Sequence, residues 1–396
     1  MRGWGWADAV LNDGLVSCAE LARVFLRLSV TAFGGPVAHI ALAEDELVTR
    51  RRWLTRDHYL DLIAAANLIP GPNSTEVMIH VGHSLRGIPG ALVSGLCFIG
   101  PAFLITLALS ILYVNNGALP EVAALFRGIQ PVIVAVIAGA GWRLLRSALQ
   151  GQRLWLLFAF GAALLATTEL PEVLVMLLAG LLHVAWQSRA AKATPAFLLT
   201  GLPALPGQLL LTAGTPGLGE LFLYFLRIGA ILFGSGYLLV AYIQQDLVVS
   251  YGWLGAQQLL DAIAIGQTTP GPVLTTSTAI GTIVAGLPGA LLATLGIFLP
   301  SFIFVMLSAP FIPRLRQSAP VRHFLGGVHA AVVAAILVTL LGLARTALSD
   351  SAGQPWLPGL ALCVLSLIAL VRWQVNATWL VLIGGVAGLL LNSAGL

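Results

Sequence analysis

The stretch Asn67-Leu68-Ile69-Pro70-Gly71-Pro72-Asn73 lies inside an apolar segment and returns two hundred residues later as Gln267-Thr268-Thr269-Pro270-Gly271-Pro272-Val273. Proline has no backbone N–H and clashes with the preceding turn of a helix, so two prolines around a glycine interrupt any helix that contains them. The repeated motif therefore predicts two broken helical segments, one in each half of the chain.

The sequence around both breaks repeats at the same spacing. The matching positions include glycine, tryptophan and charged residues: Phe25-Leu26-Arg27 with Phe225-Leu226-Arg227, Phe33-Gly34 with Phe233-Gly234, Trp53-Leu54 with Trp253-Leu254, and Leu60-Asp61 with Leu260-Asp261. After a one-residue deletion the match resumes at Pro89-Gly90-Ala91-Leu92, which returns as Pro288-Gly289-Ala290-Leu291. Because self-similarity at one fixed spacing marks a duplicated unit, we predict two homologous halves.

The composition excludes an ordinary water-soluble fold. Of 396 residues 58% are hydrophobic and only 9% are charged, and the mean hydropathy is +0.93. A soluble globular domain carries about 25% charged residues, whereas a transmembrane helix needs about 20 apolar residues. Apolar runs recur along nearly the whole chain, so we predict an all-α polytopic membrane protein with the lipid bilayer as its surroundings.

A polar stretch rich in proline and glycine, 189–218, separates the halves. We predict an interfacial N-terminal arm at 1–18, an N-terminal transmembrane repeat at 19–188 and a C-terminal transmembrane repeat at 219–396. Helices of the first repeat are expected at 20–43, 88–113, 120–143, 154–168 and 171–188, with a charged loop at 44–57 and a broken apolar segment at 58–82. The second repeat is expected to follow this plan at 219–243, 256–281, 287–309, 323–346, 356–372 and 375–393.

Arginines indicate how the halves lie in the membrane, because short cytoplasmic loops collect Lys and Arg. The loop at 44–57 holds four arginines and its counterpart at 244–257 holds none, whereas 114–119 has none and 309–322 has three. The bias changes sign between the halves, as in the inverted-topology repeats of secondary transporters. We predict an inverted repeat in which each PGP motif lies in a re-entrant or broken helical hairpin.

Irregular backbone at membrane depth is tolerated only where it is buried in protein or lines a wet cavity. The two PGP breaks and two glycine breaks, at Phe33-Gly34-Gly35-Pro36 and Phe233-Gly234-Ser235-Gly236, therefore predict a site. A helix that restarts after a PGP break offers free N–H groups to an anion. An alternative is that the prolines only kink packed helices. The candidate substrate-binding residues at the breaks are Gly34, Gly35, Pro36, Pro70, Gly71, Pro72, Asn73, Ser74, Thr75, Gly234, Ser235, Pro270, Gly271, Pro272, Thr275 and Thr276.

Arg27 and Arg227 occupy equivalent places in apolar sequence. A charge there is costly unless it is paired or hydrated, and a guanidinium matches the geometry of an oxyanion. We expect the two arginines to flank a dianion. Alternatively they snorkel to the interface, or pair with Asp61 or Asp261.

Other titratable residues are candidates for proton coupling or for structural charge. Glu76 follows Pro72 in an apolar run, where half two has Thr276, and it either carries a coupling proton or packs as a neutral acid. Asp61 and Asp261 are candidates for a proton path or for pairing with the arginines. His39 titrates near neutral pH in water, although a membrane histidine also serves as an interhelical hydrogen-bonding group.

The sequence shows no pattern for a metal, a cofactor or nucleic acid. Cys18, Cys97 and Cys363 lie far apart without a CxxC pair, so neither zinc nor a disulfide framework is indicated. The net charge of +4 is small and scattered, so no nucleic-acid partner is expected. We expect no cofactor and no metal; a homodimer is compatible with the sequence.

With Phe33-Gly34-Gly35-Pro36, Trp53-Leu54 and Pro70-Gly71-Pro72-Asn73, the sequence resembles the chromate ion transporter family in its long, two-domain form, over nearly the whole chain. The resemblance implies a multi-pass protein of the bacterial inner membrane that exports chromate from the cytoplasm. It further implies sulfate as a related anion and energy from the proton gradient or from anion exchange. The second copy departs from the pattern, with Gly234-Ser235-Gly236 in place of GGP.

Three other functions stay open from the residues alone. The same fold serves an uptake transporter for sulfate or another oxyanion, and the same breaks could line an anion channel. An intramembrane enzyme built on Ser235 is a further alternative, although the sequence shows no paired general base for it. We expect a non-enzymatic transporter.

Overall fold

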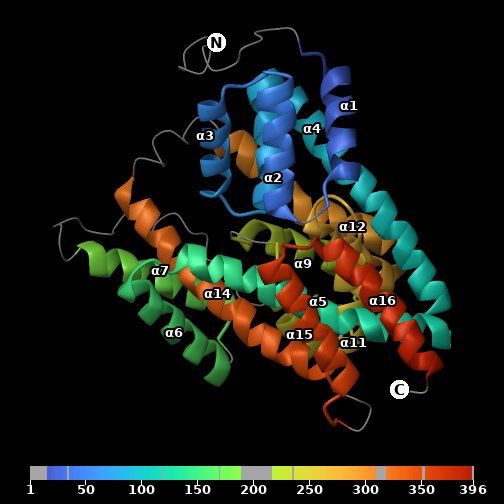
Figure 1. Cartoon of the computed structure of the whole chain (residues 1–396). Helices are drawn as coiled ribbons and strands as arrows, with labels where there is room; N and C mark the ends of the chain where they lie inside the picture. Colours follow the sequence, from blue (N-terminus) through green and yellow to red (C-terminus); the bar gives the residue numbers. More distant parts are fainter. Residues whose placement is uncertain are drawn as a thin grey trace.

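The computed structural model describes residues 16–33, 35–117, 119–168, 170–188, 216–233, 236–308, 318–349 and 353–394. Within these ranges the chain is mainly helical, and Ser349 and Pro355 form an isolated antiparallel bridge. The predicted all-α class is confirmed (Figure 1). The predicted linker at 189–218 and the arm at 1–18 lie almost entirely outside the described residues.

The first half begins with four short helical pieces and ends with longer helices. Ser17 and Thr55 start α1 and α3 by accepting a hydrogen bond from the N–H three residues ahead, which satisfies a donor that the helix leaves free. The elements are α1 (Cys18–Thr31), α2 (Pro36–Glu44), the π-helical turn η2 (Asp45–Arg50), α3 (Arg56–Ala66), α4 (Asn73–Asn116), α5 (Pro120–Ala148), α6 (Gln152–Thr167) and α7 (Glu172–Ser188).

The second half repeats this order. Its elements are α9 (Leu218–Ile231), α10 (Leu238–Ile243), the π-helical turn η3 (Gln244–Ser250), α11 (Ala256–Thr268), the 3-10 turn η4 (Val273–Thr275), α12 (Thr276–Ser308), α14 (Ala319–Ala347), α15 (Leu357–Arg372) and α16 (Ala377–Ser393). The backbone is non-helical at 67–72 and 269–272, which separates α3 from α4 and α11 from η4.

Two predictions of local structure were wrong in each half. The helix expected at 20–43 is divided into α1 and α2, and Gly35 before α2 turns the chain with a positive φ of 79°. The helix expected at 219–243 is likewise divided into α9 and α10. The connections expected between 58–82 and 88–113, and between 256–281 and 287–309, are tight kinks inside α4 and α12. Gly87 and Gly286 adopt φ of 63° and 62° there, a conformation that glycine allows without steric cost.

The charged segment at 44–57 is ordered for the most part, where a loop was expected. Arg51 binds Glu46 and Glu20 at 2.7 and 3.1 Å, and its guanidinium lies 5.0 Å from the centre of the Trp53 ring. Arg50 binds Asp45 at 2.8 Å and Arg56 binds Glu44 at 3.2 Å. These ion pairs link η2 to α1 through Arg51, and they link the end of α2 to the start of α3.

α5 and α14 each pack on the last two helices of the other half. α5 packs against α15 and α16, whereas α14 packs against α6 and α7; α4 and α12 pack against each other. Glycines permit the closest approach, because Gly128 of α5 faces the backbone of Gly384 and Gly388 in α16. At the equivalent place Gly327 of α14 faces Ala179 and Gly180 of α7. The two halves are therefore joined by exchanged contacts.

We expect Gly128→Ala to lower stability. The added Cβ would collide with the carbonyl of Gly384 and lie 2.6 Å from Gly388 Cα, and backbone atoms cannot move aside, so overpacking should cost about 1–3 kcal/mol. Thermal unfolding in detergent measures the effect. Gly100→Ala on α4 is the matched control, since its Cβ would meet nothing within 4 Å, and equal midpoints for the two variants would contradict the assigned contact.

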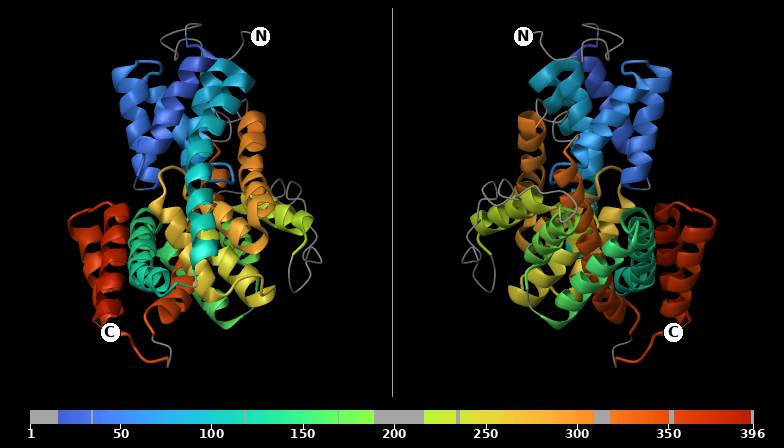
Figure 2. Two further views of the ribbon diagram at one scale, coloured as in Figure 1. Left: turned by 90° about the vertical axis from the view of Figure 1, so that its right-hand side faces the viewer. Right: turned by 90° about the vertical axis from the view of Figure 1, so that its left-hand side faces the viewer.

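Four helices in the described ranges are long and apolar enough to cross a membrane: Asn73–Asn116, Pro120–Ala148, Val273–Ser308 and Ala319–Ala347. Shorter apolar helices surround them, and large apolar side chains such as Leu104 and Leu307 lie exposed on the outer faces. α1 to α3 and the start of α4 share a smaller hydrophobic core of their own, and form a block that stands at one end of the molecule (Figures 1 and 2). These features are those of an all-α membrane protein.

Candidate functional site

The four breaks of the two halves meet at the centre of the molecule. The N–H of Gly71 donates to the carbonyl of Leu232 at 2.6 Å, and the N–H of Gly271 donates to the carbonyl of Ala32 at 3.1 Å. Ala32 and Leu232 are equivalent residues of the repeat, each at the C-terminal end of the first helix of its half. Each PGP break is therefore bonded to the glycine break of the other half.

Both bonds require glycine in the PGP motif. Gly71 and Gly271 adopt φ of 142° and 92°. A Cβ at Gly71 would collide with the Glu76 carboxylate and lie 2.8 Å from Ser301 Oγ, and one at Gly271 would lie 2.8 Å from Ala102 Cβ. Ser301 and Ala102 are themselves equivalent residues, so each PGP tip presses against the long kinked helix of the other half.

A small cavity opens beside these bonds. Its volume of about 20 Å³ holds one water molecule, which needs about 10–15 Å³ by the same measure. Both halves and the first turn of α16 contribute to its wall: Ala32, Gly35, Tyr237, Gly266, Gln267, Thr269, Gly271, Val273, Ala377 and Thr378. A ligand larger than water enters only if the breaks move apart.

The PGP tip of the first half is surrounded by buried polar groups that have no hydrogen-bond partner among the described residues. Glu76 is 0% exposed, and neither carboxylate oxygen has a hydrogen-bond partner among the described residues. Thr75 Oγ1 and Ser301 Oγ are likewise buried and unpaired there. His39 lies nearby on α2, with Nδ1 3.3 Å from Ser74 Oγ. Because an unsatisfied buried polar group costs about 1–3 kcal/mol, the cluster is costly to stability in this arrangement.

In the equivalent tip of the second half, the hydroxyl groups form hydrogen bonds within the tip itself. Thr275, Thr276 and Ser277 donate their hydroxyl hydrogens to the carbonyls of Pro272, Val273 and Leu274 at 2.8 to 2.9 Å. Those bonds close the turn η4 and leave no free carboxylate at the position of Glu76. The two tips are therefore alike in backbone and different in side-chain chemistry.

The two candidate arginines do not line the cavity. Arg27 lies on the exposed face of α1, and its carbonyl accepts the hydroxyl of Thr31. Arg227 is half-buried on α9 and interacts electrostatically with Asp246 of η3 and Glu172 of α7. Each lies about one turn before the C-terminal end of a helix that leads to a break.

Asp261 is held by two side chains of the first half. It is buried on α11 and accepts hydrogen bonds from Tyr113 at 2.7 Å and from Gln130 at 2.8 Å. Its equivalent Asp61 is half-buried on α3. Sequence reasoning missed Tyr113 and Gln130, because single polar residues in long apolar helices give no pattern that points to a partner about 130 to 150 residues away.

The candidate prolines lie at the predicted breaks, either at the start of a helix or in a non-helical segment. Pro36 begins α2, and Pro72 precedes α4, in whose first turn Asn73 lies near Asn67 with Nδ2 2.5 Å from its Oδ1. Pro70 and Pro270 lie in the non-helical tips. Gly34, Gly234 and Ser235 lie outside the described residues. Ser301, Tyr237 and Gln267 join the site only through tertiary contacts.

Comparison with known proteins identifies relatives over most of the chain. The family model described as chromate transporter matches residues 19–184 and 219–389. A chromate transport protein of Cupriavidus metallidurans is 33% identical, covering 87% of this chain and 87% of its own length. A probable chromate transport protein of Synechococcus elongatus is 32% identical, covering 84% of this chain and 86% of its own length. A chromate transport protein of Pseudomonas aeruginosa is 29% identical, covering 94% of this chain and 92% of its own length. No solved structure matches the chain.

Proposed function

The chain belongs to the chromate transporter family, and from this premise we propose that it is a secondary active transporter that moves chromate out of the cytoplasm across the bacterial inner membrane. The driving force is the proton gradient or exchange for another anion. Relatives named as transport proteins, matched over both halves, support transport rather than catalysis.

The observation that carries the proposal is the reciprocal bonding of the breaks at the centre of the molecule. Secondary transporters bind their substrates at the interface of such repeats. The first N–H groups of a helix have no partner inside it and favour an anion, and α2 and α4 both begin at the breaks. A tetrahedral dianion would bind between the two tips, once they separate, through the backbone and hydroxyl groups of the candidate residues.

Glu76 is the proposed coupling group. A buried carboxylate with neither an ion pair nor a hydrogen bond is accommodated far better with its proton than without it. Separation of the tips would hydrate Glu76 and let the proton leave. Proton release and anion access would then depend on the same movement.

Arg27 and Arg227 are proposed to attract the dianion toward the breaks rather than to hold it there. Each stands on a helix whose C-terminal end forms part of the centre. Focused positive charge raises the local concentration of an anion and its rate of entry. Asp61, Asp261 and His39 are assigned to the structural support of the tips.

We also propose that the halves have inverted topology. In Figure 1 the block of α1, α2 and α3 lies above the centre of the molecule and α11 lies below it. α3 and the part of α4 before its kink are each shorter than the membrane is thick, as expected for a re-entrant hairpin.

Labelling of single cysteines placed at 50–56 and 250–256 tests the orientation. The proposal expects a membrane-impermeant maleimide to modify the two segments from opposite sides of the membrane. Modification of both from the same side would contradict an inverted repeat.

Uptake into inside-out vesicles tests the function. The proposal expects labelled chromate to accumulate when the vesicle interior is acidified, because that orientation and gradient reproduce export. Accumulation only in right-side-out vesicles would identify an importer. Passive equilibration without countertransport would identify a channel, and a parallel measurement with labelled sulfate, a dianion of the same shape, determines which anion is preferred.

A further inference from the structure

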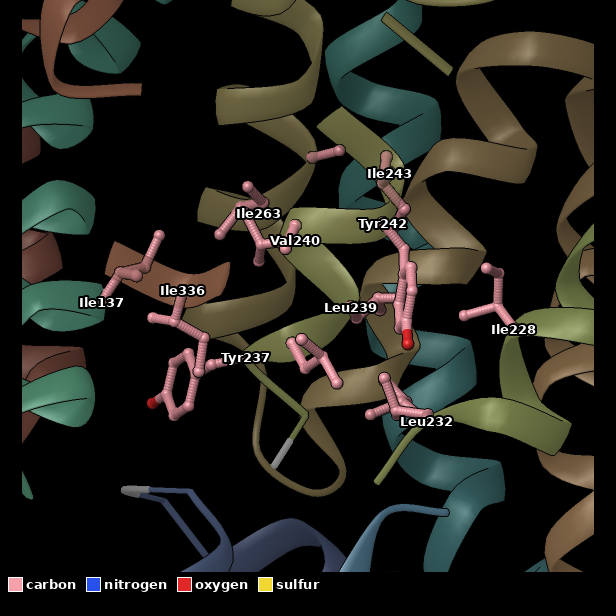
Figure 3. Packing of buried hydrophobic residues seen from close by; sticks show 14 of the residues in the cluster. Ile137, Ile228, Leu232, Tyr237, Leu239, Val240, Tyr242, Ile243, Ile263 and Ile336 are labelled. Carbon is pink, nitrogen blue, oxygen red and sulfur yellow. The ribbon is translucent and has the colours of Figure 1, made fainter. Parts of the chain in front are cut away.

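The two halves use equivalent elements but pack them differently. In the second half α10 is enclosed: every residue from Leu238 to Ile243 is buried, and so is every residue of α11 from Leu259 to Gly266. Figure 3 shows Val240 and Tyr242 of α10 among side chains that include Ile137 of α5 and Ile336 of α14. Besides α12 and η3 of its own half, α11 packs against α5, α14, α16 and α4, and α10 packs against α14.

The equivalent face of the first half is open. Val37 and Leu42 of α2 are 76% and 39% exposed, and Leu60 of α3 is 45% exposed. α2 and α3 have their main helix contacts with α1, η2 and α4, within the block at one end of the molecule (Figure 2). In the repeat α5 corresponds to α14, and α16 corresponds to α7. If α2 and α3 were covered as α10 and α11 are, the covering helices would therefore be α5, α14 and α7.

The tips themselves do not share this asymmetry. The bonds of Gly71 to Leu232 and of Gly271 to Ala32 are both present, and Gly71 touches Ser301 as Gly271 touches Ala102. The first block is therefore rotated away from the long helices while its tips stay at the centre. An arrangement of this kind allows a block to pivot about its tips.

The repeat identifies the contacts that closure would form. α5 and α14 match residue for residue, so the contacts of one half can be transferred to the other. Gln244 Nε2 lies 3.2 Å from the place of a Cβ at Gly342, and the equivalent residues are Glu44 and Arg143, which have opposite charges. Gln130 donates to Asp261 at 2.8 Å, and the equivalent residues are His329 and Asp61, again a base and an acid.

We propose that the face formed by α2 and α3 is a docking surface for α5 and α14 of the same chain, occupied in a second conformation in which α10 and α11 are released. In that conformation the ion pair of Glu44 with Arg56 breaks and Glu44 pairs with Arg143 instead. Asp61 then lies in contact with His329. The proposal deepens the transport function, since it names the parts that alternate, but it rests on the duplication and not on which anion is carried.

Distances between paired spin labels test the exchange in the full chain reconstituted into liposomes. The three native cysteines are replaced by serine, and labels are placed at Glu44→Cys with Arg143→Cys. The matched pair is Gln244→Cys with Gly342→Cys, which is close in this structure. Sulfate serves as the anion, because chromate oxidises thiols.

We expect two distance populations for each pair, with sulfate shifting the two pairs in opposite directions. A single long distance for 44 and 143 under all conditions would overturn the proposal, even if the protein transports anions. A short distance that forms only between separately labelled molecules would overturn it in favour of a second copy on this face. If the first pair fails to fold, Asp61→Cys with His329→Cys gives the same measurement.

Discussion

Gly71→Ala is expected to reduce anion transport about 5- to 150-fold, because overpacking at the tip that joins the two halves costs about 1–3 kcal/mol. The added methyl group would displace the Glu76 carboxylate and press on Ser301 Oγ. The bond from Gly71 to Leu232, which joins the two halves at their centre, would weaken with it. Initial rates of chromate or sulfate flux in proteoliposomes measure the effect.

Gly87→Ala is the matched control for this substitution. Gly87 also has a positive φ, 63°, but a Cβ there would meet nothing within 4 Å. The control has comparable backbone strain without the collision at the tip, so we expect its transport rate to exceed that of Gly71→Ala by at least about tenfold. Equal losses in the two variants would mean that backbone strain at either glycine explains the effect, and the central role of the tip would be wrong.

Glu76→Gln is expected to abolish transport driven by a pH gradient and to leave exchange of one anion for another. The amide keeps the shape of the carboxyl group in its buried position but cannot take up or release a proton. Proton-driven accumulation should fall at least about tenfold, and the remaining exchange should lose its dependence on pH. Both rates are measured in the same vesicles, with and without an imposed gradient.

Glu121→Gln controls for the loss of a carboxylate. Glu121 lies exposed in the first turn of α5, and the pH profile of this variant should match that of the unaltered protein. An unchanged pH profile for Glu76→Gln would remove Glu76 from the proton path. Loss of both exchange and gradient-driven transport in Glu76→Gln, with normal insertion, would instead assign Glu76 to substrate binding.

Much of the local structure could be predicted from sequence because it depends on nearby residues. Pro70-Gly71-Pro72 and Pro270-Gly271-Pro272 exclude a continuous helix whatever surrounds them, and the structure leaves helical geometry at both. Phe33-Gly34-Gly35-Pro36 predicts a break, so the single helix expected over 20–43 was wrong at a place where the sequence itself indicates irregular backbone. Gly35 turns the chain there with a positive φ of 79°.

The site depended on contacts between distant segments. The sequence pointed to Glu76 through its position after Pro72, but not to Ser301, which lies beside it from the other half. Arg27 and Arg227 occupy equivalent places, yet one is exposed and the other lies by Glu172 and Asp246. Equivalent residues of a duplication receive different neighbours once the halves pack asymmetrically.

The sequence by itself determined the duplication, the positions of the breaks and the membrane setting, since backbone sterics and apolar content act locally and do not depend on the partner. Only the tertiary structure decided that each PGP break bonds to the other half and that Glu76 is buried with no hydrogen-bond partner in the described part of the chain. It also decided that α10–α11 are enclosed while α2–α3 are open. The reason is that hydrogen bonding and burial depend on which distant surfaces meet. In a duplicated chain the same sequence pattern permits either half to be the enclosed one.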